Sequence, residues 1–198
     1  MMKIDRRRVL SHGACLAGGA GLGWLGVRFG LPGLPATDAA QEADTPEKRL
    51  KKLGLELPTP GKPRATLAAA MQSGDLLFLS GHIATDKAGK PFVGKVGKDL
   101  TLAQGQEAAR RVGLTILGVL RAELGNLDRV AQLVKTLGMV NCAPDFTQQP
   151  QVIDAFSQLM IDVFGEKAGR GARSAVGMVS LPLGVAVEIE CVLRVTGR

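Results

Sequence analysis

The sequence predicts an α+β domain in which helices cover one side of a β-sheet. Two long segments carry apolar residues at helical spacing, and five shorter ones have the length and composition of strands, in the order β-β-α-β-α-β-β. Hydrophobic residues make up 45% of the 198-residue chain, as in an ordinary globular core. We therefore expect one main domain over residues 64–198, preceded by a leader and tether over 1–40 and a helical arm over 41–63.

The first 40 residues have the composition of an export signal. Residues 6–10, Arg-Arg-Arg-Val-Leu, resemble a twin-arginine motif, and a weakly apolar stretch diluted by glycine follows them. That stretch is too short and too rich in glycine for a stable membrane span of ~20 residues. We expect a periplasmic or secreted protein, with a cytoplasmic protein or an uncleaved anchor as the alternatives. Cell fractionation tests this expectation, and an intact full-length chain in the cytoplasm would contradict it.

An amphipathic arm and two strands are expected before the first long helix. Residues 46–57 carry leucines at helical spacing between lysines, and three prolines, the first at position 58, end that helix. Residues 64–72 are predicted as an edge strand, and residues 73–75, Ser-Gly-Asp, as a turn. The continuous apolar run over 76–80 is then predicted as a strand buried on both faces.

The first long helix is predicted over residues 101–124. Thr101 and Gln104 have the spacing of a capping box, and Gly125 supplies the glycine that commonly follows a helix. The next apolar segment, residues 130–141, is predicted as a strand.

The second long helix is expected between that strand and Gly165. Thr147 is its expected cap, and Pro150 falls in its first turn, where proline is tolerated. The apolar face of this helix is predicted to consist of Val152, Phe156, Leu159, Met160 and Val163.

Residues 171–195 are predicted as two strands joined by a tight turn. Residues 182–184, Pro-Leu-Gly, form the turn, because proline cannot continue a strand ladder and glycine tolerates positive φ. The second strand alternates at period two, with apolar side chains on one face and Glu188 and Glu190 on the other. Arg173 opens the first strand. Charged groups within apolar strands are costly unless they are paired or functional, so this hairpin is the candidate functional region.

Four short motifs stand in the predicted hairpin and in the run before it. They are L-L-F-L-S-G at 76–81, A-R-S-x-V at 172–176, L-P at 181–182 and V-x-V-E-I-E at 185–190. Together they resemble the Rid family, the reactive intermediate deaminases, which is also called the YjgF or endoribonuclease L-PSP family. The resemblance implies a chorismate-mutase-like fold, a homotrimer, and the hydrolysis of 2-imino or enamine acids to 2-keto acids and ammonia without a metal or cofactor.

The resemblance also implies roles for individual residues. Arg173 would hold the substrate carboxylate by two parallel hydrogen bonds, and Glu188 would position or activate a water at the imine carbon. Backbone groups near Gly81 and Ala175 would orient the substrate. His82 stands where the family usually has glutamine, and it is a possible catalytic residue or a structural histidine.

Three positions depart from the family pattern. Leu67, Ile153 and Ala175 stand where many members have tyrosine, asparagine and cysteine. Two functions therefore stay open, an imine deaminase and a non-catalytic trimeric protein that binds small carboxylates on the same fold. A ribonuclease is the third reading, but His12 and His82 are the chain's histidines and do not suggest an acid–base pair.

Composition argues against nucleic-acid and metal binding. The net charge of +7 is partly in the leader and forms no block, tyrosine is absent, and the single tryptophan is Trp24 in the leader. The three cysteines form no CxxC pair or metal-spaced cluster with histidine, so we expect buried thiols.

The predicted hairpin also fixes an expected distance between the two site residues. Antiparallel pairing around Leu183 places Glu188 opposite Met178. Arg173 then lies roughly 16 Å away at ~3.3 Å per residue. One pocket that uses both residues would therefore need them from neighbouring chains.

Overall fold

The computed structural model describes residues 44–61, 66–85 and 89–197. The predicted leader and tether, residues 1–40, lie outside the described residues. Among the described helices, none is long and apolar enough to cross a membrane.

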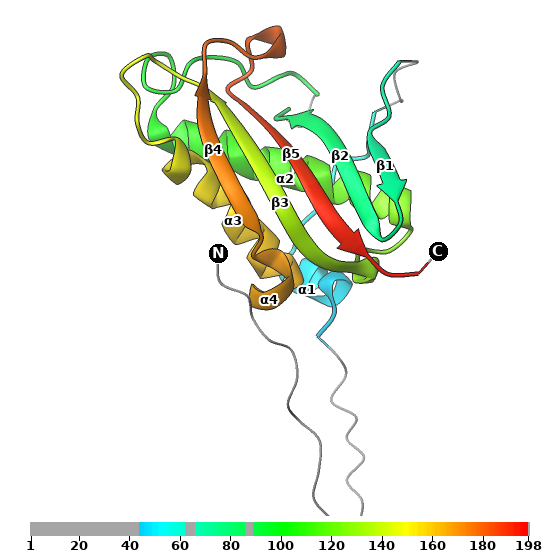
Figure 1. Cartoon of the computed structure of the whole chain (residues 1–198). Coiled ribbons are helices and arrows are strands. Elements are labelled where there is room, and N and C mark those ends of the chain that lie inside the picture. The colour runs from blue at the N-terminus through cyan, green and yellow to red at the C-terminus, as the bar shows by residue number, and fades with distance from the viewer. Residues whose placement is uncertain (1–43, 62–65, 86–88, 198) are drawn as a thin grey trace, which may run out of the picture. The chain divides into compact units, whose positions relative to one another are not determined.

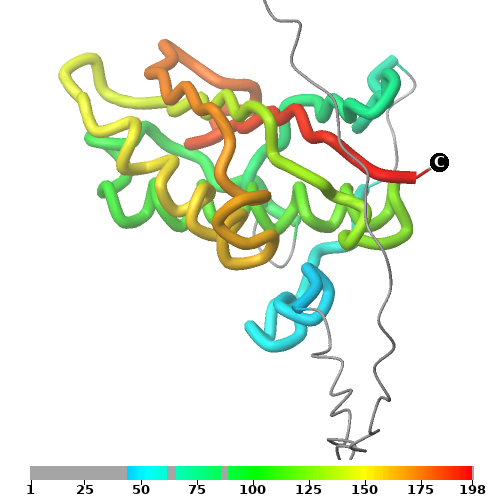
Figure 2. The backbone as a smooth tube through the Cα atoms, turned by 60° about the horizontal axis from the view of Figure 1, so that its bottom comes forward, coloured from blue at the N-terminus to red at the C-terminus, as the bar shows by residue number. Residues whose placement is uncertain are grey.

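The described residues form a five-stranded sheet with helices on one face (Figure 1). The strand order is β1-β2-β5-β3-β4, and all neighbours are antiparallel except β3 and β4, which are parallel. Helices α2 and α3 pack against that face and against each other, as Figure 2 shows from another side. The α+β class and the predicted element order are confirmed. The bounds are β1 Ala70–Ser73, β2 Leu76–Ile83, α2 Leu102–Leu124, β3 Val130–Asn141, α3 Gln149–Phe164, β4 Ala172–Met178 and β5 Val187–Val195.

The predicted hairpin over residues 171–195 is wrong. β3 lies between β4 and β5, so Thr136 is the partner of Arg173 on one side and of Cys191 on the other. Glu188 is opposite Met139 rather than Met178. The reason is the crossover: a strand that follows a crossover helix pairs in parallel with the strand before that helix. Helix α3 makes this crossover from β3 to β4, and β5 takes the other edge of β3.

The predicted turn itself is present between β4 and β5. Residues Pro182–Gly184 form a short 3₁₀ segment in which Leu183 has φ 57° and Gly184 has φ 68°. The turn reverses the chain direction as predicted, but it carries the chain past β3 instead of folding it back onto β4.

The long helices follow the sequence pattern closely. Thr101 and Gln104 form the capping box of α2, and Gly125 ends it in the left-handed conformation. The predicted apolar face of α3 is fully buried. Thr147 is not its cap, because α3 begins at Gln149 with Gln148 in the cap position and without a side-chain cap. Pro150 lies in the first turn as predicted.

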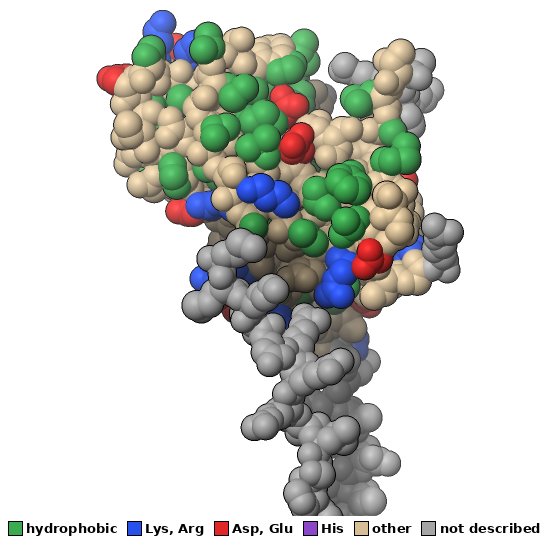
Figure 3. All heavy atoms as spheres, viewed as in Figure 1, with side chains coloured by type: hydrophobic (Ala, Val, Ile, Leu, Met, Phe, Trp, Pro, Cys, Tyr) green, Lys and Arg blue, Asp and Glu red, His purple; other side chains and the backbone are tan. Residues whose placement is uncertain are grey.

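The strand β2 is buried on one face only, in contrast to the prediction. Leu77 and Leu79 are 3% and 5% exposed, whereas Phe78 between them is 44% exposed. Phe78 belongs to the sheet face opposite the helices, which we call the open face. Figure 3 shows apolar side chains gathered on the open face, with acidic side chains among them.

The first strand and the arm are shorter than predicted. Strand β1 is limited to Ala70–Ser73. The arm helix α1, Pro46–Lys52, is capped by Thr45 and ends before Gly54, which has φ 63°. Leu50 of α1 is part of the core, but Leu53 is exposed.

The arm is tied to the helix layer at two places. The Glu47 carboxylate accepts hydrogen bonds from Nε and Nη2 of Arg121, at 3.2 and 2.7 Å, and from the Leu127 amide at 3.1 Å. Further on, the carbonyl oxygen of Pro58 occupies the space that a Cβ would take at Gly118 in α2. The arm therefore crosses α2 at a position where only glycine leaves enough room.

The Glu47 contact gives a stability prediction. Glu47→Ala should lower the free energy of unfolding by about 1–2 kcal/mol, because it leaves the Leu127 amide and Arg121 without their acceptor. Denaturant unfolding measures the change. The matched control is Glu107→Ala, which removes a surface i,i+4 pair with Arg111 and should cost less than about 0.5 kcal/mol. Equal effects in the two variants would contradict the prediction.

Candidate functional site

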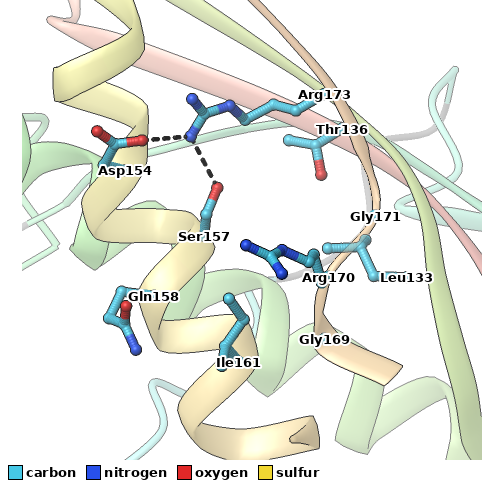
Figure 4. Close-up of a pocket in the computed structure, with 10 residues that line it drawn as sticks. All are labelled: Leu133, Thr136, Asp154, Ser157, Gln158, Ile161, Gly169, Arg170, Gly171 and Arg173. Carbon is cyan, nitrogen blue, oxygen red and sulfur yellow. Dashed lines mark hydrogen bonds and ion pairs between the residues drawn. The ribbon is translucent and has the colours of Figure 1, made fainter. Parts of the chain in front are cut away.

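Arg173 lies on β4 and points toward the helix side of the sheet. Its register partner Thr136 is 2% exposed beneath the helices, and register partners share a face. Its Nη1 donates to Oδ1 of Asp154 at 2.8 Å and to Oγ of Ser157 at 3.0 Å (Figure 4). Helix α3 therefore supplies the partners of the predicted carboxylate-binding arginine.

A pocket of about 490 Å³ lies beside Arg173. It is bounded by α3, by the beginning of β4 and by the short helix α4, Glu166–Gly169 (Figure 4). Arg170 also lines it, although its guanidinium forms an exposed ion pair with Glu166. Its remaining lining is a mixture of polar, apolar and glycine residues: Leu133, Thr136, Asp154, Ser157, Gln158, Ile161, Gly169 and Gly171.

Glu188 lies on the open face of the sheet, away from this pocket. Along β5 the side chains of Val187 and Ile189 are fully buried beneath the helices, so Glu188 between them projects to the other side. Its carboxylate lies against Gly81 of β2, where any side chain would overlap with Oε1. The structure thus brings together two of the predicted site residues, Gly81 and Glu188.

An irregularity in β2 makes room for the Glu188 carboxylate. The register between β2 and β5 shifts between Leu79 and His82, and Gly81 lies within this shift. Glycine leaves room there for the carboxylate, which occupies the position of the missing side chain, so a larger residue would displace the Glu188 side chain.

The surroundings of Glu188 favour its neutral form. Partial burial raises the pKa of the Glu188 carboxyl, and the negative charge of Glu190 raises it further. A carboxyl group with a raised pKa is better suited to exchange a proton near neutral pH than an ordinary surface glutamate.

His82 does not join Glu188. It pairs with Ile189, whereas the next residue, Ile83, pairs with Glu188. The His82 Nδ1 lies 2.6 Å from the Ser80 carbonyl oxygen. Burial lowers the pKa of His82, although that hydrogen bond opposes the effect. These contacts hold the His82 ring against the backbone of β2 rather than against Glu188.

The positions that depart from the family pattern have structural roles or lie outside the site. Ala175 is paired with Gly138 of β3 and packs against the core. Ile153 is fully buried, and its Cδ1 would lie 2.6 Å from a Cβ at Gly138. Leu67 is half-exposed in the segment before β1.

Arg173 and Glu188 lie on opposite faces of the sheet, which corrects the geometry predicted from the hairpin. The two residues are also separated by β3, because they belong to β4 and β5. Within one chain, the sheet itself therefore separates the guanidinium from the carboxylate. Asp154, not Glu188, is the ion-pair partner of Arg173.

The described part of the chain contains two of the three cysteines. Cys142 and Cys191 are free and buried. Burial raises the pKa of the Cys191 thiol to about 12, which keeps it protonated. Among the described residues, no group of three or more His, Cys, Asp or Glu side chains is arranged to hold a metal ion.

Asp154 and Ser157 were not predicted from the sequence as site residues. They lie three residues apart on α3, so they share one side of the helix. Asp154 directly follows the buried Ile153, and Ser157 directly follows the buried Phe156. The crossover places that side of α3 next to β4. The sequence feature that could have identified them is a pair of polar residues three positions apart, next to the apolar face of a helix. The incorrect hairpin obscured it, because it did not place α3 beside β4.

Comparisons with known proteins agree on one family. The family model described as "YjgF/chorismate_mutase-like, putative endoribonuclease" matches residues 47–192. Protein TCP17 of Trypanosoma cruzi is 39% identical over 145 residues, which cover 73% of this chain and 91% of that protein.

Two solved structures extend the comparison. The protein Atu1372 of Agrobacterium tumefaciens, whose function is given as unknown, is 37% identical with a TM-score of 0.70, over 77% of this chain and 95% of that one. A Shewanella oneidensis protein, named "a putative endoribonuclease", is 29% identical with a TM-score of 0.72, over 77% of this chain and all of that one.

The Glu188 environment predicts a pKa change that can be measured directly. Glu190→Gln should lower the pKa of Glu188, because it removes the neighbouring negative charge that disfavours ionisation. The titration of the Glu188 carboxyl carbon by ¹³C NMR gives the midpoint in both proteins. An activity that needs ionised Glu188 falls as the pH drops through this pKa, so its acidic limb should move to lower pH as well. An unchanged midpoint would show that Glu190 does not influence Glu188.

Proposed function

The chain belongs to the YjgF (Rid) family, and from that premise we propose that it hydrolyses small 2-imino and enamine acids to 2-keto acids and ammonia. Family membership supports a Rid-like role in general. The observation that supports the finer proposal is the arrangement of Arg173. Its Nη1 donates to Asp154 and Ser157, which leaves Nε and Nη2 to bind a carboxylate. We also propose export to the periplasm or beyond, on the basis of the leader.

The proposed reaction needs one cationic clamp and one proton-exchanging group. Arg173 binds the substrate carboxylate through Nε and Nη2, and this fixes the neighbouring imine carbon. Glu188 accepts a proton from a water as the water oxygen adds to that carbon. That proton then passes to the substrate nitrogen, which gives a carbinolamine. Glu188 next takes the hydroxyl proton and passes it to the same nitrogen as the C–N bond breaks, so that ammonia leaves and the carbonyl of the 2-keto acid forms.

A site with both residues requires two chains. Arg173 lies on β4, which is an edge strand with one sheet neighbour, and Glu188 lies on the open face. The open face carries exposed apolar side chains, including Phe78 and Val176. Association through this face in a homotrimer would bury them and bring Glu188 of one chain toward Arg173 of the next.

A non-catalytic carboxylate-binding protein is the second candidate. Its specific support is Ile153, a core residue at the position where the family resemblance led us to expect an asparagine. Such a protein would keep the Arg173 clamp without efficient turnover. A ribonuclease has less support, because His82 is held by the Ser80 carbonyl and lies apart from Glu188.

Substitutions at the two site residues separate binding from turnover. Arg173→Ala should weaken binding of a small 2-keto acid by ~10–100-fold, and Arg173→Lys should not restore it, because an ammonium cannot make the bidentate contact. Glu188→Gln should leave binding nearly unchanged but slow ammonia release from enzymatically generated imino acids.

The control for lost surface charge is Arg111→Ala, whose partner is Glu107. Full deaminase activity in both the Arg173→Ala and Glu188→Gln variants would show that the site is misassigned. Tight keto-acid binding with no ammonia release from the unaltered protein would favour the binding protein over the enzyme.

Mixed oligomers test whether the site is shared between chains. Arg173→Ala chains and Glu188→Ala chains should each be inactive alone, and refolding them together should restore part of the activity, because some interfaces then carry both intact residues. The control mixes each variant with itself under the same conditions. An active monomer in sedimentation, or mixed oligomers without recovered activity, would contradict a shared site.

A further inference from the structure

Within the described part of the chain, one of the three guanidinium nitrogens of Arg173 makes hydrogen bonds. Nη1 donates to Asp154 and to Ser157, which uses both hydrogens of that nitrogen. Nε and Nη2 form the remaining edge, and such an edge gives a carboxylate two parallel hydrogen bonds. In Figure 4 this edge is turned away from the side of the pocket formed by Gln158 and Ile161.

The two acceptors are attached to one rigid support. Asp154 and Ser157 are three residues apart on α3, and the adjacent side chains of Ile153 and Phe156 are fully buried. Any rotation of α3 that moved the acceptors would have to expose these core side chains. The Arg173 side chain is itself only 26% exposed. Its two acceptors therefore extend from a packed helix rather than from a loop, although the Asp154 side chain itself is 61% exposed.

On the premise of the proposed function, we propose that Asp154 and Ser157 are positioning residues, which hold Arg173 so that its Nε and Nη2 receive the substrate carboxylate. They do not touch the substrate. They accept hydrogen bonds from Nη1 of Arg173, and the other two nitrogens of Arg173 bind the acid. The Asp154 charge weakens the attraction of Arg173 for an anion, so this residue favours binding only by orienting the guanidinium.

The proposal separates the effect of geometry from the effect of charge. Asp154→Asn keeps an oxygen that can accept from Nη1 and removes the negative charge. Asp154→Ala combined with Ser157→Ala removes both acceptors. If orientation matters, the amide variant should bind a carboxylate at least as tightly as the unaltered protein, and the double variant should bind it much more weakly.

Binding of pyruvate by full-length protein provides the first measurement. The double variant should raise the Kd for pyruvate by ~10-fold or more, and Asp154→Asn should leave it equal or lower. Asp162→Asn is the matched control, because Asp162 is also on α3 and accepts from Gln158 rather than from Arg173. An unchanged Kd in the double variant would overturn the proposal, as would an Asp154→Asn variant as weak as the double variant.

A second measurement needs no ligand. NMR relaxation of the Arg173 Nε–Hε group measures how ordered the side chain is. The order should be high in the unaltered protein and in Asp162→Asn, and low in the double variant. Unchanged order in the double variant would overturn the positioning role. If the order is lost as expected but neither pyruvate nor imino acids bind even the unaltered protein, the proposed function fails and the carboxylate-orienting role fails with it.

Discussion

The close approach of helix α3 to the sheet is the constraint on which the candidate site depends. Gly138 of β3 has no side chain, and Ile153 of α3 fills the space beneath the helix. A Cβ at Gly138 would lie 2.6 Å from Cδ1 and Cγ1 of Ile153, so either that side chain or α3 would have to move. Because α3 lies this low, its polar residues Asp154 and Ser157 reach Arg173 on β4. The glycine in the core thus lies directly beneath the part of α3 that supplies both partners of Arg173.

The sheet divides the proposed chemistry into two halves. The cationic half, at Arg173, is built by the helix side, and the acidic half, Glu188 against Gly81, is built on the open face. Each half is supported within its own chain, by α3 or by the β2 irregularity. If the site is shared as proposed, each chain forms both halves by itself but needs a neighbouring chain to bring one of each together.

Sequence patterns predicted the faces of the elements better than their neighbours. The alternation of apolar and polar residues along β5 placed Glu188 on the face opposite the core. The capping box at Thr101 located the start of α2 to within a residue. That alternation could not predict that β3 lies between β4 and β5, because it identifies the buried face of a strand and not the strand's pairing partner. Likewise, nothing local at Asp154 identifies it as the partner of Arg173, since that contact exists only through the parallel crossover.

The strand order has a consequence for synthesis of the chain. β5 is the latest of the five strands in the sequence, yet it lies between β2 and β3 and joins the β1–β2 pair to the β3–β4 pair. Until β5 emerges from the ribosome, the two strand pairs have no common ladder, and the apolar faces of α2 and α3 have no complete sheet to cover. The five-stranded sheet can therefore close only after β5 has been made, because β5 is the strand that gives the two pairs a common neighbour.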